Sequence, residues 1–173
     1  NDKAASDLKR RTDQAHVDSQ EALARAISAG DLPQIKRLLG IRARRINDRS
    51  SEGGSTPLSS ASLHGHLDIA KYLIQRGAKV EATNSDGNTP LHVAAFLCRS
   101  EIVQLLLDKG GSAVTKNGRG ETPIDVVSAA WSSQLADFYT SIGNGIGLKL
   151  DLKRIERERP QIAKLLRDYN SPP

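Results

Sequence analysis

Three of the four histidines, His64, His66 and His92, are the side chains best suited to metal binding or to acid–base chemistry near neutral pH. His64 and His66 are two residues apart, and His92 lies far from both in the sequence. A metal site needs about four Cys, His or carboxylate ligands that converge, and the spacing around these residues supplies no such set. We therefore expect no metal site, and we interpret the histidines as residues of the surface and of the contacts between packed units.

Other motifs that carry chemistry are equally incomplete. Gly143, Gly145 and Gly147 alternate as in a phosphate-binding loop, but neither a predicted strand nor a following Lys-Ser/Thr pair accompanies them. Serine, histidine and aspartate all occur without a nucleophile-elbow sequence, and Cys98 is a lone cysteine. We therefore expect a protein that is not an enzyme and that takes no cofactor, and we interpret the three glycines as a loop between helices.

The elements that position these residues follow a fixed period. Thr-Pro-Leu at residues 56–58 and 89–91 and Thr-Pro-Ile at 122–124 are 33 residues apart. Threonine is a good helix N-cap and proline is favoured at the first helical position, so each pair predicts the start of a helix. A repeat of this length indicates stacked units, each of which completes its apolar core against its neighbours.

Each unit also contains a second predicted helix. Ile69 and Leu73 are four residues apart, and Ile102 and Leu106 repeat that spacing one period later. Glycine follows a basic residue at the end of each of these segments, which is typical of a helix C-terminus. Asn and Gly residues then gather just before each threonine, at 84–88 and 117–121, and predict the tight turns that we call the tips.

Residues 56–78 resemble an ankyrin repeat along their whole length, and Thr-Pro-Leu-His-Val-Ala-Ala at 89–95 restates the signature of that family. The resemblance implies an all-α solenoid of stacked helix-turn-helix units with β-turn tips, without enzymatic activity, that recognises another protein. Two positions depart from the family pattern. Ser59 replaces the usual histidine, which implies a weaker junction between units, and Cys98 stands where Gly65 closes the preceding loop, so that loop must form without glycine.

The resemblance divides the chain into an arm and four units. Residues 1–20 are polar, include the basic cluster 9–11, and are expected to form a frayed or helical arm. The repeat domain is predicted at 21–170, and its first part lacks Thr-Pro, as expected of a terminal cap. Its predicted units are a capping unit at 21–55, repeats at 56–88 and 89–121, and a C-terminal unit at 122–170.

The C-terminal unit is longer than the others. The second-helix pattern returns at residues 162–166, 40 residues after Thr122 against 13 in the preceding unit, which predicts a helical insertion of 27 residues at about 133–159. We expect the first helix of this unit to continue beyond its usual length, the glycines from Gly143 to break it, residues 150–158 to form a short helix, and Pro160 to begin the last one. A competing register takes Leu135 and Ala136 as the second helix.

In ankyrin proteins, partners usually lie against the tips and the outer face of the first helices, which together form a concave surface. Carried over by position, the predicted partner-binding residues are Ser51, Glu52, Ser55, Leu63, His64, Ser85, Asp86, Asn88, Phe96, Leu97, Arg119 and Glu121. Three of them are apolar where solvent alone would favour polar side chains, which is typical of a protein-binding groove. The alternative is that the insertion of the fourth unit covers this strip.

Charge and composition leave two other classes of function open. The net charge of +5 permits a polyanion or nucleic-acid binder that uses the basic clusters, but aromatic side chains are only 3% of the chain and are not interleaved with those clusters. The other class is a structural module of a larger assembly. We expect a monomer with an unidentified protein partner, without nucleic acid and without a membrane span. The start at Asn1 leaves both a secreted or periplasmic protein, after signal removal, and a cytoplasmic protein open.

Overall fold

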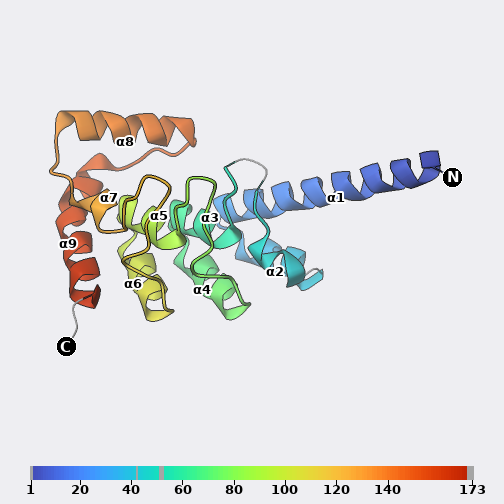
Figure 1. The fold of residues 1–173 in the computed structure, drawn as a ribbon, viewed down its shortest axis with the longest axis horizontal. Helices are drawn as coiled ribbons and strands as arrows, with labels where there is room; N and C mark the ends of the chain where they lie inside the picture. The colour runs from blue at the N-terminus through green and yellow to red at the C-terminus, as the bar shows by residue number, and fades with distance from the viewer. Residues whose placement is uncertain (1, 42, 51–52, 171–173) are drawn as a thin grey trace.

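A computed structural model of the chain describes residues 2–41, 43–50 and 53–170. Its helices stack in two layers, and no β-strand occurs within these ranges (Figure 1). The layer of first helices contains α1 (Asp2–Ser28), α3 (Pro57–His64), α5 (Pro90–Phe96) and α7 (Asp125–Ser128). The layer of second helices contains α2 (Leu32–Ile41), α4 (Leu67–Gln75), α6 (Ser100–Asp108) and α9 (Leu152–Asn170). The 3₁₀ helix η1 (Ala43–Asn47) follows α2, and α8 (Ser133–Gly145) lies outside both layers.

The Thr-Pro pairs begin helices as the sequence predicts. The Thr56 hydroxyl accepts a hydrogen bond from the Ser59 amide at 3.2 Å, and the Thr89 hydroxyl accepts one from the His92 amide at 3.4 Å. Thr122 and Asp125 reproduce the arrangement with a carboxylate, which accepts from the Thr122 amide at 2.8 Å. These bonds satisfy amides that have no partner within the helix, so each cap fixes the residue at which its unit starts.

The core repeats with the sequence. Leu58 and Leu91 are both fully buried, and so are Leu73 and Leu106, their counterparts on the second helices. Alanines at equivalent positions of α3 and α5 let the first helices approach closely. The result is a thin core that runs along the whole stack.

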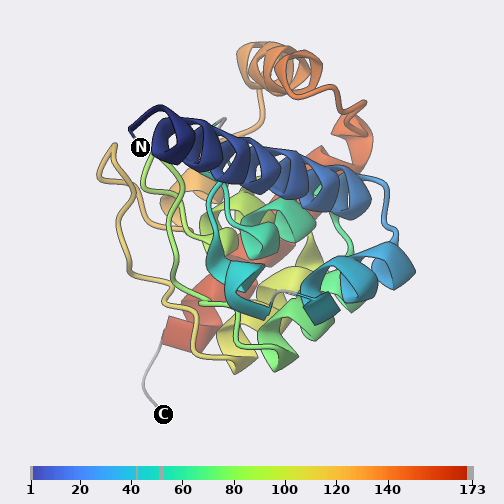
Figure 2. The same ribbon diagram turned by 90° about the vertical axis from the view of Figure 1, so that its right-hand side faces the viewer.

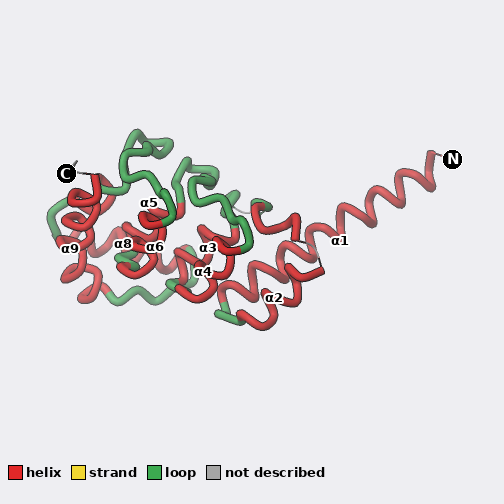
Figure 3. Tube along the Cα trace, turned by 90° about the horizontal axis from the view of Figure 1, so that it is seen from below, coloured by secondary structure: helices red, strands yellow, loops and turns green. Residues whose placement is uncertain are grey.

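The tips lie on one side of the helices (Figure 3), and backbone hydrogen bonds join them in a ladder. The Ser85 amide donates to the Gly53 carbonyl at 3.0 Å, and the Gly118 amide donates to the Asp86 carbonyl at 2.8 Å. Within its own tip, the side-chain oxygen of Asn117 accepts from two backbone amides at 2.9 and 3.0 Å. Each tip is therefore closed internally and is also bonded to the next.

A second ladder links the loops between the two helices of each unit. The ring of His66 lies 3.3 Å from the Ser28 carbonyl, and Arg99, one period later, donates to the Leu63 carbonyl at 3.2 Å. Cys98 adopts a φ of 51°, where Gly65 has 81°, so the loop forms without glycine as predicted. A positive φ is costly for a residue with a side chain. Here Arg154 of the fourth unit donates to the Cys98 carbonyl, which stabilises this conformation.

Residues 2–20 are helical, which is one of the two forms expected of the arm. They belong to α1, which continues into the first unit and projects from the stack (Figure 1). The fourth unit differs from the sequence prediction, because its first helix, α7, has only four residues and does not continue beyond the usual length. Arg159 donates to the Ala129 carbonyl at 3.0 Å, and Ala129 is extended, so the chain leaves the helix there.

The end of the insertion agrees with the prediction in one respect and differs in another. The glycines end a helix as expected, because α8 stops at Gly145 and Gly147 has a φ of 68°. The short helix predicted at 150–158 and the separate helix predicted from Pro160 are wrong, because α9 is one helix of 19 residues with Pro160 inside it. Proline in a helix interior costs about 3 kcal/mol. Ile155 and Ile162, on either side of it, are both buried, and their burial offsets that cost. The boundaries of the four units stay a prediction, while α9 packs against α7 and α6 in the place of a second helix.

His92 ties the third unit to the tip that follows it. Its Nδ1 accepts from the Thr89 amide at 3.2 Å, so Nε2 carries the proton and donates to the Glu121 carbonyl at 3.0 Å. Burial lowers the pKa of His92, although the Glu121 carbonyl partly opposes this effect. The Ser59 hydroxyl, by contrast, bonds within its own unit, to Thr56.

We expect Gly118→Ala to destabilise the protein by about 1–3 kcal/mol, because a Cβ there would lie 2.6 Å from the Asp86 carbonyl oxygen. Urea unfolding monitored by circular dichroism measures the change. Gly40→Ala is the control. Gly40 lies in α2 with no atom within 4 Å of the new Cβ, so this change should stabilise by up to about 1 kcal/mol. Equal effects of the two substitutions would show that the contact between tips does not limit stability.

The His92 bonds should make stability depend on pH. Because the folded-state pKa of His92 is lowered, its contribution is fully present above the ordinary value of 6.5 and is lost as the pH falls below that value and through the lowered one. We expect His92→Gln to cost about 1 kcal/mol at about pH 7.5 and less at about pH 5.5, because glutamine can accept from the same amide and does not titrate. Urea unfolding of both proteins at both pH values tests this expectation, and a difference that does not change with pH would contradict it.

Candidate functional site

Helix α8 overhangs the layer of first helices (Figures 1 and 2). It forms one wall of a groove. The opposite wall is made of the tips and of α3 and α5. A cavity of about 210 Å³ lies between them, and most of its lining is apolar. The residues around it are Leu63, Asn84, Asp86, Asn88, His92, Val93, Phe96, Leu97, Arg119, Val126, Phe138, Ile142 and Ile146.

Tyr139 anchors α8 in this position. Its side chain is fully buried, and its ring stacks on Phe96 with 4.4 Å between the ring centroids. Its hydroxyl donates to the Phe96 carbonyl at 2.7 Å and lies 2.5 Å from the guanidinium of Arg159, which donates to it. Burial raises the pKa of Tyr139 to about 12, so the phenol remains protonated and able to donate at neutral pH.

Most of the predicted partner-binding residues lie at this groove. Leu63, Asp86, Asn88, Phe96 and Arg119 line the cavity, with Phe96 half-buried under α8. Ser85 and Glu121 lie in the tips next to lining residues, and Ser55 and His64 are half-buried in the part of the groove towards α1. Ser51 and Glu52 lie outside the described residues.

Leu97 is the exception among the predicted surface residues. Its side chain is only 1% exposed, so the interpretation of Leu97 as part of the exposed strip is wrong. Its carbonyl accepts a hydrogen bond from Arg154 at 3.0 Å, and the same guanidinium donates to the Cys98 carbonyl at 2.8 Å. These bonds hold α9 against the end of α5.

The structure adds a wall that the position-by-position comparison missed. Phe138, Ile142 and Ile146 follow one another at four-residue intervals along α8 and just beyond it, and all three line the cavity. Phe138 is 45% exposed and Ile146 is 41% exposed, which is unusual for such large apolar side chains. The spacing was visible in the sequence, but it fitted a core helix equally well. The insertion therefore covers only part of the apolar strip and leaves the rest accessible.

Charges at the tips are unequally compensated. Arg119 forms an ion pair with Glu121 at 2.8 Å, and the Glu121 carboxylate also accepts from Asn117 at 3.1 Å. The hydrogen bonds from Asn117 and Arg119 lower the pKa of Glu121, so this pair is ionised at neutral pH. Asp86 is exposed, and its carboxylate has no hydrogen bond or ion pair within the described ranges. The cavity thus has one uncompensated negative charge at its rim.

The groove continues towards α1 as a wide, open depression of about 700 Å³, which Leu63 and Ile146 also line.

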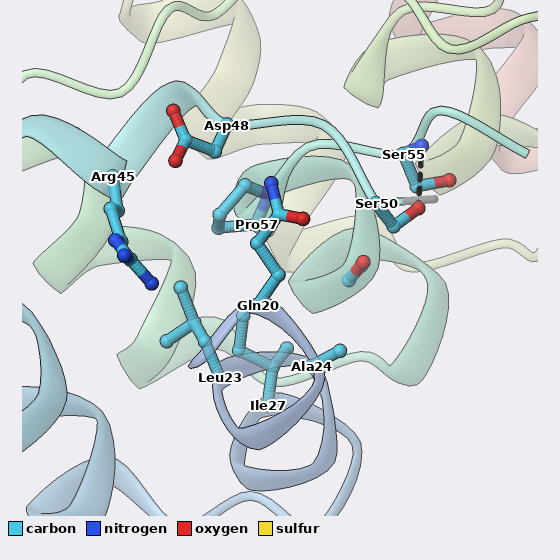
Figure 4. Close-up of a pocket in the computed structure, with 10 residues that line it drawn as sticks. Gln20, Leu23, Ala24, Ile27, Arg45, Asp48, Ser50, Ser55 and Pro57 are labelled. Atoms are coloured by element: carbon cyan, nitrogen blue, oxygen red, sulfur yellow. Dashed lines mark hydrogen bonds between the residues drawn. The ribbon is translucent and has the colours of Figure 1, made fainter. Parts of the chain in front are cut away.

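A much smaller cavity lies where α1 meets η1 and α3 (Figure 4). Leu23 and Ile27 from α1 face Pro57 there, and the Ser55 amide donates to the Ser50 hydroxyl at 3.1 Å. Its volume of about 30 Å³ holds water at most, so we interpret it as a packing defect of the first junction.

His64 and His66 pack against each other, and Cys98 lies in the core. The rings of His64 and His66 stack with centroids 5.9 Å apart, and no cluster of three metal-binding side chains occurs in the part of the chain that the structure describes. Cys98 is buried, and that burial raises its pKa to about 11, which leaves the thiol protonated and unreactive. Among the described residues, no helix is both long enough and apolar enough to cross a membrane.

We expect Tyr139→Phe to destabilise the protein by about 1–3 kcal/mol, because it leaves the Phe96 carbonyl without its donor and removes one of the acceptors of the Arg159 guanidinium. Thermal and urea unfolding measure the loss. Tyr169→Phe is the matched control, since the Tyr169 hydroxyl also donates to a helix carbonyl, of Leu107, but its side chain is 49% exposed. A loss below about 0.5 kcal/mol is expected there, and an equal loss in both variants would contradict the role of Tyr139 as the anchor.

Comparison with known proteins also identifies repeats in this chain. A family described as ankyrin repeats, in three copies, matches residues 23–118. Protein fem-1 homolog A of Homo sapiens is 40% identical over 73 residues, which are 40% of this chain and 11% of that protein. Protein phosphatase 1 regulatory subunit 27 of Homo sapiens is 42% identical over 71 residues, 41% of this chain and 45% of that protein.

A third relative comes from a virus. The putative ankyrin repeat protein FPV240 of Fowlpox virus (strain NVSL) is 34% identical over 74 residues, which are 43% of this chain and 18% of that protein. The chain thus spans less than half the length of each of these three relatives. The family match covers more than half of the residues, and the Thr-Pro caps and the ladder of tips repeat within it. The chain therefore belongs to the ankyrin-repeat family.

Proposed function

We propose that this protein binds another protein in the groove between α8 and the tips, without catalysing a reaction. Ankyrin repeats generally act as protein–protein interaction modules and are generally not enzymes. The observation that carries the proposal is the exposure of Phe138 and Ile146 in a cavity whose opposite wall is also apolar. Large apolar side chains that gather at a hollow with a polar rim are typical of interaction sites.

The groove is suited to binding because its walls are held in place before a partner arrives. The tips are bonded to each other, and Tyr139 fixes α8 by one buried hydroxyl and one stacked ring. A preformed surface loses little conformational entropy on binding, so a small contact area can still give useful affinity. The partner-binding residues are then those predicted at the groove, without Leu97, together with Phe138, Ile142 and Ile146.

A regulatory role for such binding has support from one relative. The name of Protein phosphatase 1 regulatory subunit 27 describes a protein that acts as a subunit of another protein. The matching segment, with 42% identity, includes 41% of this chain. A non-catalytic subunit or adaptor is therefore the form of binding that we favour, with a monomer as the expected state of the free chain.

Binding of a polyanion is the second candidate, and the structure weakens part of it. Arg154 and Arg159, in the basic segment near residue 155, are engaged with backbone carbonyls of the third and fourth units. The cluster at residues 9–11 is exposed on α1 and stays free to contact an anionic partner. Binding to generic DNA that falls steeply with salt concentration would favour this candidate.

We expect Phe138→Ser to abolish capture of a partner protein from an extract of the source organism. Val114→Ser is the matched control, because Val114 is 56% exposed, lies outside the groove and should not change capture. Circular dichroism and thermal unfolding should be nearly unchanged in both variants. Phe96→Asp would be a poorer test, since Phe96 stacks on Tyr139 and its loss would displace α8. A partner that Phe138→Ser retains as well as the unaltered chain would refute the proposal.

A further inference from the structure

We infer that the groove selects a protein segment in which a bulky apolar side chain stands next to a lysine or arginine. This inference rests on the proposed function of the groove and specifies the chemistry of its partner. Two properties of the same cavity carry it. One is the size and apolar lining of the space under α8, and the other is the uncompensated carboxylate of Asp86 at its rim.

The space under α8 fits one large side chain. A cavity of about 150 Å³ that is lined by apolar side chains holds benzene, and this one is about 210 Å³. Phe96 and Phe138 meet edge to face in it, with 6.1 Å between the ring centroids and an interplanar angle of 77°. An aromatic ring or a leucine that enters beside them would be buried between two walls of the groove, which favours an apolar anchor over a polar one.

The chain itself leaves part of the apolar lining of the cavity exposed. Tyr139 is the side chain that fixes α8, and it turns one side of the helix to the repeats. Ile142 and Ile146, further along, face the same cavity, yet Ile146 remains 41% exposed. The apolar surface of α8 therefore extends beyond the part that its own chain covers, towards the open depression next to α1.

The negative charge at the rim favours a cationic residue next to the apolar anchor of the partner. Arg119 is neutralised by Glu121, whereas the carboxylate of Asp86 is exposed and unpaired within the described residues. The ionised groups of these three residues leave one net negative charge beside the cavity, although the whole chain carries +5. A cation next to the anchor gains Coulomb energy with Asp86, and an anion there is repelled.

The backbone fixes the place of this carboxylate. The Asp86 amide donates to the Asn84 side chain at 3.0 Å, and its carbonyl accepts from Gly118 at 2.8 Å. Both bonds leave the side chain free, so Asp86→Asn removes the charge without removing any contact that holds the tip. The charge can therefore be tested separately from the fold.

The test uses three probes of the same shape: 3-phenylpropylamine, which is cationic, 3-phenylpropan-1-ol, which is neutral, and 3-phenylpropanoate, which is anionic. Chemical shifts of the isotope-labelled full chain, followed by NMR during titration at low salt, give the three dissociation constants and the residues affected. We expect shifts around Phe96 and Phe138, and an affinity for the amine at least about fivefold above that for the propanoate.

Three variants test which residues cause the preference for the cationic probe. Asp86→Asn should make the affinities for the amine and the propanoate equal, while Asp68→Asn, which removes an exposed carboxylate from α4 on the other layer, should leave the ratio unchanged. Phe138→Ser should weaken all three probes by about tenfold. Equal affinities in the unaltered chain, a preference that survives Asp86→Asn, or shifts confined to residues outside the cavity would each overturn the inference.

The outcomes separate this inference from the proposed function. If Phe138→Ser loses the captured partner but the probes show no preference for the cation, the groove binds proteins and the inference about partner chemistry is wrong. If the probes follow the expected order but Phe138→Ser still captures the partner, the cavity has the inferred chemistry and the partner binds elsewhere.

Discussion

The carbonyl groups at the end of each first helix are the constraint on which this structure depends. A helix of seven or eight residues leaves its last four carbonyls without partners inside the helix, and in a stacked solenoid these groups cannot all reach water. The next unit supplies the donor, through His66 to Ser28 and through Arg99 to Leu63. Stacking is therefore specified by hydrogen bonds at the loops as much as by the apolar core.

At the third unit this scheme must change. The fourth unit has no loop at the usual distance, because residues 129–151, which include α8, separate α7 from α9. Tyr139 and Arg154 supply the donors instead, to the Phe96, Leu97 and Cys98 carbonyls. Tyr139 comes from α8 and Arg154 from α9, so satisfying the end of α5 also places α8 over the concave surface. The wall of the groove is thus a consequence of how the insertion completes the solenoid.

Features that depend on residues near one another in this chain could be predicted from the sequence, and features that depend on distant residues could not. The period, the Thr-Pro caps, the glycine-rich tips and the layers of helices depend on residues near one another, and these predictions are confirmed. The break after α7 depends on Arg159, which is 30 residues from the carbonyl that it bonds, and no local pattern announces it. Leu97 failed as a surface residue for a related reason. Its place in the repeat predicts exposure, but its side chain is only 1% exposed, and Arg154, from the far end of the chain, binds its carbonyl.

The charge next to the cavity also differs from the net charge of the sequence. The net charge of +5 describes the chain, and it favours acidic partners when nothing else is known. Folding then pairs Arg119 with Glu121 and directs Arg154 and Arg159 to backbone carbonyls, so several positive groups near the groove are already engaged. Asp86 bonds to its own tip and to the next one through its backbone amide and carbonyl, which leaves its carboxylate free. The surface next to an apolar cavity can therefore carry the opposite sign from the protein as a whole, and the local sign acts on a partner within a Debye length of about 8 Å.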